Sequence, residues 1–153
     1  MEDDFFALFY SRELNEFVDA LMHDDDSNRA LTMISNKAVD FDSRYCVDGV
    51  DMPVLYIAVV NKKFPVVDEL IRLGARFDDY VESCGTKYSL VFYALVTKNY
   101  DSMTYFEANK ADIQAPASDG TDALYWACVN RHLGLVERFV RAGFDTKKYY
   151  YGR

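Results

Sequence analysis

Apolar residues recur along the chain in short clusters with the three- and four-residue spacing of an amphipathic helix. The stretch 53–78, PVLYIAVVNKKFPVVDELIRLGARFD, contains two such clusters separated by the polar residues Asn-Lys-Lys. Pro65 suits the first turn of the second helix, where an N–H has no intrahelical partner, and Gly74 suits the left-handed position that ends it. The pattern predicts two short helices and a stop.

The same pattern occurs three times. Leu55 and Ala58 are matched 36 residues later by Val-x-x-Ala, and a further 33 residues on by Leu-x-x-Ala. Ser89 and Asp122 are predicted to cap the first helix of the later copies, and Asp51 that of the earlier copy. One helix pair cannot bury both of its faces, so the copies are expected to stack.

The segments 53–78 and 119–145 resemble the ankyrin repeat, whose consensus runs G-x-T-P-L-H-x-A-A and then G-H-x-x-V-V-x-L-L-L-x-x-G-A-D. Segment 87–113 is similar to a degenerate middle copy. The resemblance implies an all-α fold, an ankyrin-repeat solenoid of about four helix-turn-helix units in an L-shaped stack with short hairpin-like tips. The Thr-Pro of the consensus is nowhere intact, and its His is replaced by an aromatic residue in each copy.

A single domain, 1–153, is expected. Residues 1–47 are interpreted as a divergent cap and first repeat, with a capping helix at 2–10 and a separate helix after it. The remaining predicted parts are a repeat at 48–80, a degenerate repeat at 81–116, a C-terminal repeat at 117–147 and a tail at 148–153, whose tyrosines are expected to pack onto the last repeat.

Composition narrows the possible partners. Half of the 153 residues are hydrophobic, which is enough for a core, and the formal net charge is −8. That charge argues against binding to nucleic acid or to an anionic membrane. It indicates either a basic protein partner or a role in solubility alone. Three cysteines in no metal or redox spacing predict free thiols. The absence of a signal peptide and of a long apolar run predicts a cytoplasmic protein.

No catalytic motif is evident. The chain lacks the nucleophile, phosphate-binding and zinc motifs that carry known chemistry. The run His-Asp-Asp-Asp at 23–26 is typical of a solvated turn, and His132 matches a structural loop position of the resembled family. We therefore expect no catalytic residue, cofactor or metal, and an enzyme remains a remote alternative.

The resemblance implies that a partner binds the turn tips and the inner, concave face of the first helices. Aromatic residues there could be exposed hot spots or buried substitutes for the consensus His, and exposure is favoured for Tyr88. The candidate partner-binding residues share these positions: Asp48, Asp51, Met52, Tyr56, Asn61, Tyr88, Phe92, Thr97, Asp119, Thr121, Tyr125, Trp126 and Asn130.

The function expected from these features is non-catalytic protein–protein binding. Small, acidic ankyrin-like chains resemble immunity proteins, which implies an inhibitor that neutralises a basic toxin or enzyme domain. The alternative is an adaptor or effector that recruits or sequesters a host protein. The oligomeric state is left open.

Overall fold

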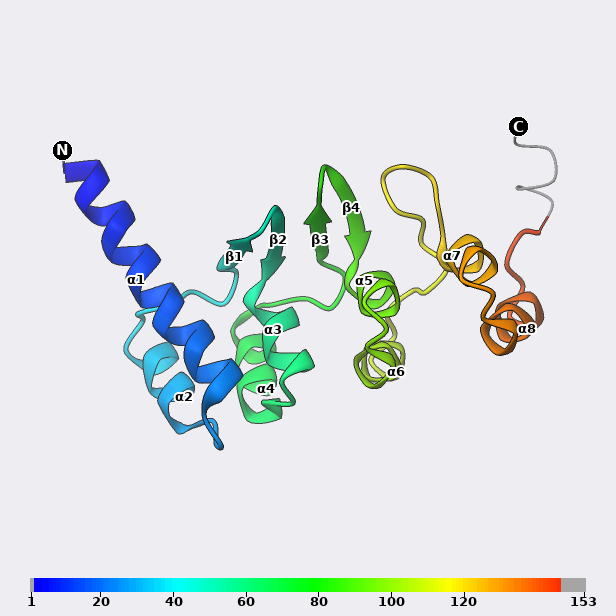
Figure 1. Cartoon of the computed structure of the whole chain (residues 1–153). Helices are drawn as coiled ribbons and strands as arrows, with labels where there is room; N and C mark the ends of the chain where they lie inside the picture. The colour runs from blue at the N-terminus through cyan, green and yellow to red at the C-terminus, as the bar shows by residue number, and fades with distance from the viewer. Residues whose placement is uncertain (1, 147–153) are drawn as a thin grey trace. The chain divides into compact units, whose positions relative to one another are not determined.

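The computed structural model describes the backbone of residues 2–146 and the side chains of residues 12–146 (Figure 1). The chain divides into two compact units, Met1–Cys84 and Gly85–Arg153. The described part of the first unit contains α1 (Glu2–His23), α2 (Asn28–Ser35), β1 (Arg44–Val47), β2 (Val50–Pro53), α3 (Val54–Val60), α4 (Phe64–Leu73) and β3 (Tyr80–Ser83). The described part of the second contains β4 (Thr86–Ser89), α5 (Leu90–Val96), α6 (Tyr100–Ala108), α7 (Ala123–Val129) and α8 (Leu133–Arg141).

The strands correct the predicted fold class. In the first unit, β1 pairs antiparallel with β2, and β2 pairs antiparallel with β3. Together with β4, these strands show that the prediction of an all-α ankyrin-repeat solenoid is wrong, and that the chain is a mixed α/β protein.

The turns explain why strands form where only helix-connecting tips were expected. Asp48 and Gly49, between β1 and β2, both have positive φ, 52° and 80°, as a type I′ hairpin turn requires. Cys84 and Gly85, which follow β3, have φ of 51° and 87°. The flanking residues are rich in Val and Tyr, which favour extended backbone. An Asp-Gly pair between such residues is itself a hairpin signal that the sequence analysis did not use.

Three helix pairs follow the predicted spacing: α3 with α4, α5 with α6, and α7 with α8. The loop inside each pair contains one left-handed residue, at Lys62, Lys98 and Arg131, with φ between 56° and 61°. Pro65 lies in the first turn of α4, and Gly74 ends that helix with φ of 125°, so both predictions are confirmed.

Two of the three predicted N-caps are confirmed. The Ser89 hydroxyl accepts from the backbone N–H of residue 92, and the Asp122 carboxylate accepts from that of residue 125. Asp51, by contrast, lies in β2 and faces another partner, while Pro53 precedes α3 without a side-chain cap. At the N-terminus, α1 is one helix over the segment for which two were predicted.

Each unit has its own core. In the first unit, α1 packs on α2 and α3, and Phe17, Leu21 and Leu70 are fully buried. In the second unit, the rings of Phe106 and Phe139 are buried where the helix pairs pack. Full burial of one such side chain stabilises the fold by about 1.5–3 kcal/mol. No helix in the described part of the chain is long and apolar enough to span a membrane. The predicted docking of the tyrosine-rich tail lies outside the described residues.

Candidate functional site

The aromatic row predicted as a binding surface does not form. Tyr56 and Phe92 are 4% and 1% exposed, so they belong to the core and cannot contact a partner. Tyr88 is half-buried rather than exposed, with its ring edge-on to Phe92 at 5.2 Å between centroids. Trp126 is half-buried as well, and Tyr125 is 43% exposed.

The polar residues at the ends of the first helices have a structural role. Asn61, Thr97 and Asn130 each donate a side-chain hydrogen bond to the carbonyl four residues earlier in their own helix, at 2.8, 3.0 and 2.9 Å. The same carbonyls also accept from the backbone N–H of residues 61, 97 and 130, so each side chain adds a second hydrogen bond at the end of its helix. The repeated polar residue at this position is therefore explained by helix termination.

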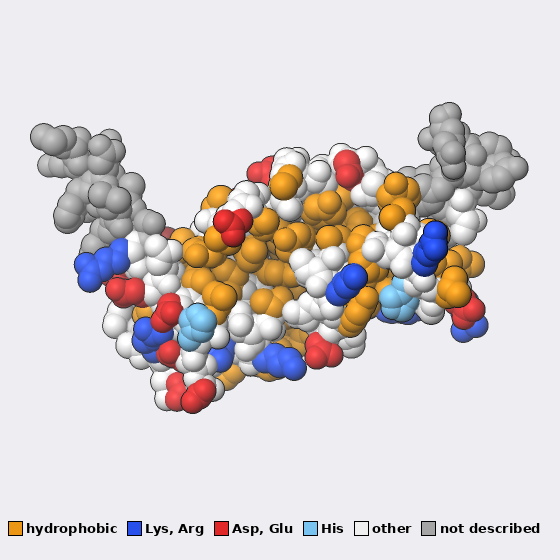
Figure 2. Space-filling model, in the orientation of Figure 1, with side chains coloured by type: hydrophobic (Ala, Val, Ile, Leu, Met, Phe, Trp, Pro, Cys, Tyr) orange, Lys and Arg blue, Asp and Glu red, His pale blue; other side chains and the backbone are white. Residues whose placement is uncertain are grey.

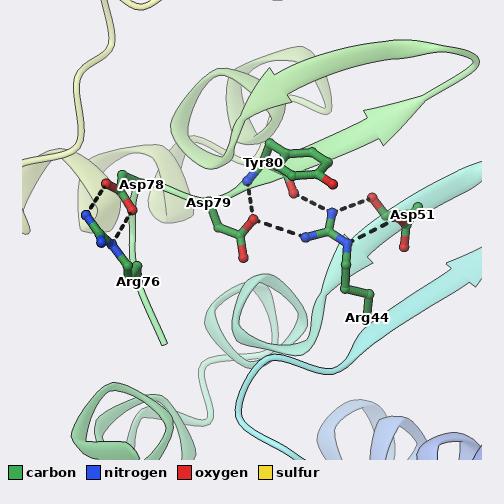
Figure 3. A network of polar contacts seen from close by, with 6 residues as sticks. All are labelled: Arg44, Asp51, Arg76, Asp78, Asp79 and Tyr80. Carbon is green, nitrogen blue, oxygen red and sulfur yellow. Dashed lines mark hydrogen bonds and ion pairs between the residues drawn. The ribbon is translucent and has the colours of Figure 1, made fainter. Parts of the chain in front are cut away.

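Arg44 is the centre of a polar network that the sequence analysis missed (Figure 3). Its guanidinium donates to a carboxylate oxygen of Asp51 at 3.1 Å and to one of Asp79 at 3.0 Å. It also donates to the backbone carbonyls of Asp51 and Tyr80, at 3.3 and 2.7 Å, and stacks 4.2 Å from the centroid of the Tyr80 ring. Arg44 therefore links β1, β2 and the start of β3.

This network changes the interpretation of the predicted acidic tips. Asp51 was a candidate for binding a basic partner, but the Arg44 side chain already neutralises it. The sequence contained a signal for this network, because Arg44 is the one arginine between residues 30 and 71, in a segment rich in aspartate. Which carboxylate it would select depends on the strand register, with Arg44 opposite Pro53 and Asp51 opposite Glu82.

Several other carboxylates are paired with arginines. The Arg29 side chain binds Asp19 and Asp24, and its hydrogen bond lowers the pKa of Asp19. Arg76 binds both carboxylate oxygens of Asp78 at 2.9 and 2.8 Å (Figure 3). Because these charges are balanced within the chain, they contribute little to attraction of a basic protein.

A smaller set of carboxylates is exposed and has no ion-pair partner among the described residues. Asp40, Asp42 and Asp48 lie on either side of β1 in the first unit. In the second unit, the Asp119 carboxylate accepts from the Thr121 hydroxyl at 2.6 Å, which lowers the pKa of Asp119. On the face shown in Figure 2, acidic and basic side chains are interspersed rather than separated by sign. Attraction of a basic partner therefore depends on local groups.

The structure assigns a structural role to His132. Its Nδ1 accepts from the backbone N–H of Leu135 at 3.2 Å at the start of α8, and its ring lies 5.8 Å from that of Tyr100. Among the described residues, no cluster of three or more His, Cys, Asp or Glu side chains could hold a metal ion. A cavity of about 590 Å³ lies in the first unit, between α1, residues 37–40 and β1.

A second feature that the sequence did not predict is an apolar face on α7 and α8, which we call the α7–α8 face. It consists of Tyr125, Cys128, Val129, Val136 and Val140. Val129 is 61% exposed and Val140 47% exposed. These side chains surround a cavity of about 410 Å³. Apolar surface gathered in this way is typical of an interaction site.

No protein-family model matches the chain, and no curated protein is significantly similar to it in sequence. These comparisons therefore add no support to the family resemblance noted in the sequence.

Proposed function

We propose that the chain is a non-catalytic protein-binding protein, and that it acts as an inhibitor of a basic protein domain such as a toxin, in the manner of an immunity protein. The observation that supports this is the group of exposed carboxylates at Asp40, Asp42 and Asp48. None of them has a basic partner among the described residues, although Arg44 lies in the same segment.

Arg44 is occupied by Asp51 and Asp79, so it does not neutralise the three carboxylates around it. The net charge of −8 adds a long-range attraction for a cationic surface. Such complementarity raises the association rate more than it slows dissociation, and salt weakens it.

The test begins with the partner. The tagged full-length chain is cross-linked in its native source, and the captured protein is identified by mass spectrometry and then expressed. We expect a basic domain whose activity is suppressed on binding, and an association rate that falls at least about tenfold between low and high salt. A captured protein that is acidic, or that keeps its full activity in the complex, would contradict the proposed inhibition.

A pair of matched variants tests the surface. Replacing Asp40, Asp42 and Asp48 with asparagine should lower the association rate about tenfold, because three unpaired negative charges are removed. The control removes the same charge from exposed sites elsewhere, with Asp25→Asn, Asp68→Asn and Asp112→Asn. Equal effects of the two triple variants would show that net charge alone acts, and would refute a local site.

A further inference from the structure

We propose that the α7–α8 face is an interface with a second copy of this chain. This inference goes beyond the proposed inhibitor function, because it concerns a different surface, in the second unit.

In the preceding helix pair, three of the five equivalent positions are buried. Thirty-three residues before Tyr125, Cys128 and Val136 lie Phe92, Leu95 and Met103, which are 1%, 0% and 3% exposed. The counterparts of Val129 and Val140 are Val96 and Glu107, which are half-buried. Within the second unit, α5 packs against α7. An apolar face of this pattern is therefore covered, inside the same molecule, by another helix pair.

For α7 and α8, the described part of the chain supplies no further helix pair. Tyr125 is 43% exposed, whereas its counterpart Phe92 is 1% exposed. The face also has a cavity of about 410 Å³ with almost entirely apolar walls. An apolar side chain that enters this cavity removes hydrophobic area of both molecules from water, which drives association. Tyr125 is suited to anchor such a contact, since a rigid ring loses little conformational entropy.

The charges beside this face favour a second copy as the occupant. On α8, Glu137 and Arg141 are 71% and 82% exposed, with a carboxylate–guanidinium distance of 4.0 Å. In a two-fold symmetric contact, each surface meets itself, so Glu137 of one copy can face Arg141 of the partner subunit and the reverse. Arg138 on α8 pairs with Glu107, as Arg141 does with Glu137, so the charges beside this face are balanced in a chain of net charge −8. Repulsion between two acidic copies is therefore weaker at this face than the net charge suggests.

The test is sedimentation equilibrium of the full chain from micromolar to millimolar concentration. We expect a concentration-dependent dimer. The double variant Val129→Asp, Val140→Asp should weaken dimerisation at least about tenfold, because it buries charge in an apolar contact. The control Val47→Asp, at an exposed apolar site in β1 that is 40% exposed, should leave dimerisation unchanged. Circular dichroism confirms that each variant is folded.

A charge exchange tests the symmetric geometry. Glu137→Arg and Arg141→Glu should each weaken the dimer, because like charges then meet across the axis, and the double exchange should restore it. A chain that is monomeric at every concentration overturns the proposal, as does a dimer that Val129→Asp, Val140→Asp leaves intact. The proposal also fails if the chain dimerises only after Tyr149, Tyr150 and Tyr151 are changed to serine, since the occupant is then its own tail. None of these results depends on binding of a basic partner.

Discussion

Replacement of Arg44 by methionine tests whether the polar network holds the strands of the first unit together. Methionine keeps most of the apolar stem and removes the guanidinium, which is the donor of four hydrogen bonds to Asp51, Asp79 and Tyr80. We expect the variant to fold but to be less stable. The loss should fall in the first unit, where β1, β2 and β3 pair.

The size of the expected loss in stability follows from how exposed Arg44 and its partners are. The Arg44 side chain is 23% exposed, and those of Asp51 and Asp79 are 33% and 32% exposed. Fully exposed ion pairs contribute about 0–1 kcal/mol, and hydrogen bonds to charged groups about 1.5–3 kcal/mol when water is excluded. The site lies between these limits, and the two abandoned carboxylates can regain water. We therefore expect Arg44→Met to lower the free energy of unfolding by about 2 kcal/mol.

The assay is urea denaturation followed by far-ultraviolet circular dichroism, with Arg76→Met as the matched control. Arg76 also binds a carboxylate through two hydrogen bonds, but the pair is 76% and 67% exposed, so its loss should leave stability almost unchanged. A double-mutant cycle of Arg44→Met with Asp79→Asn isolates the pair from the rest of the network. Equal stabilities for the Arg44 and Arg76 variants would refute the reasoning that burial sets the value of this network.

Three further predictions use the same measurement. Phe92→Ala should lower the free energy of unfolding by about 3–5 kcal/mol, because it leaves a cavity in the core. Tyr125→Ala, at the equivalent exposed position, should lower it by less than about 1 kcal/mol. Similar losses in the two variants would contradict the assigned burial. Asp122→Ala should lower the free energy of unfolding by about 1–2 kcal/mol, because α7 loses its N-cap. Asp122→Asn should keep most of this stability, because asparagine also caps helices. Because the Thr121 hydroxyl lowers the pKa of Asp119 below 3.8, this carboxylate stabilises the fold above that pH and ceases to do so as the pH falls through its lowered pKa. The acid-induced loss of stability should therefore be smaller in Asp119→Asn, and an unchanged pH profile would oppose this account.

The sequence by itself determined features that depend on a few neighbouring residues. Pro65 and Gly74 mark the first turn and the end of α4, and Ser89 and Asp122 cap the helices that follow them. These features were predictable because each acts within about one helical turn. Pro fixes φ at the start of a helix, Gly adopts the positive φ that ends one, and a cap side chain accepts from a backbone N–H that has no partner in the helix. The Asp-Gly pair of the first hairpin was a signal of the same local kind.

Pairings between distant segments were decided by the tertiary structure. The strand register places Arg44 against Asp51 and Asp79, and so removes Asp51 from the predicted acidic surface. The sequence spacing does not specify which carboxylates Arg44 binds, because several aspartates lie close to it in the sequence. Among the described residues, Asp40, Asp42 and Asp48 have no ion-pair partner, because the fold directs Arg44 to Asp51 and Asp79.

The burial of individual residues shows most directly what local sequence predicts and what tertiary packing decides. Phe92 and Tyr125 are aromatic residues at equivalent positions of two similar helices, yet they are 1% and 43% exposed. Their local sequence predicts the same helix in both places, as the structure confirms. What differs is whether another helix pair packs on that face, and this is a property of the assembled fold. The amino-acid sequence therefore determined which residues form these helices, and tertiary packing alone decided which of their faces remain exposed.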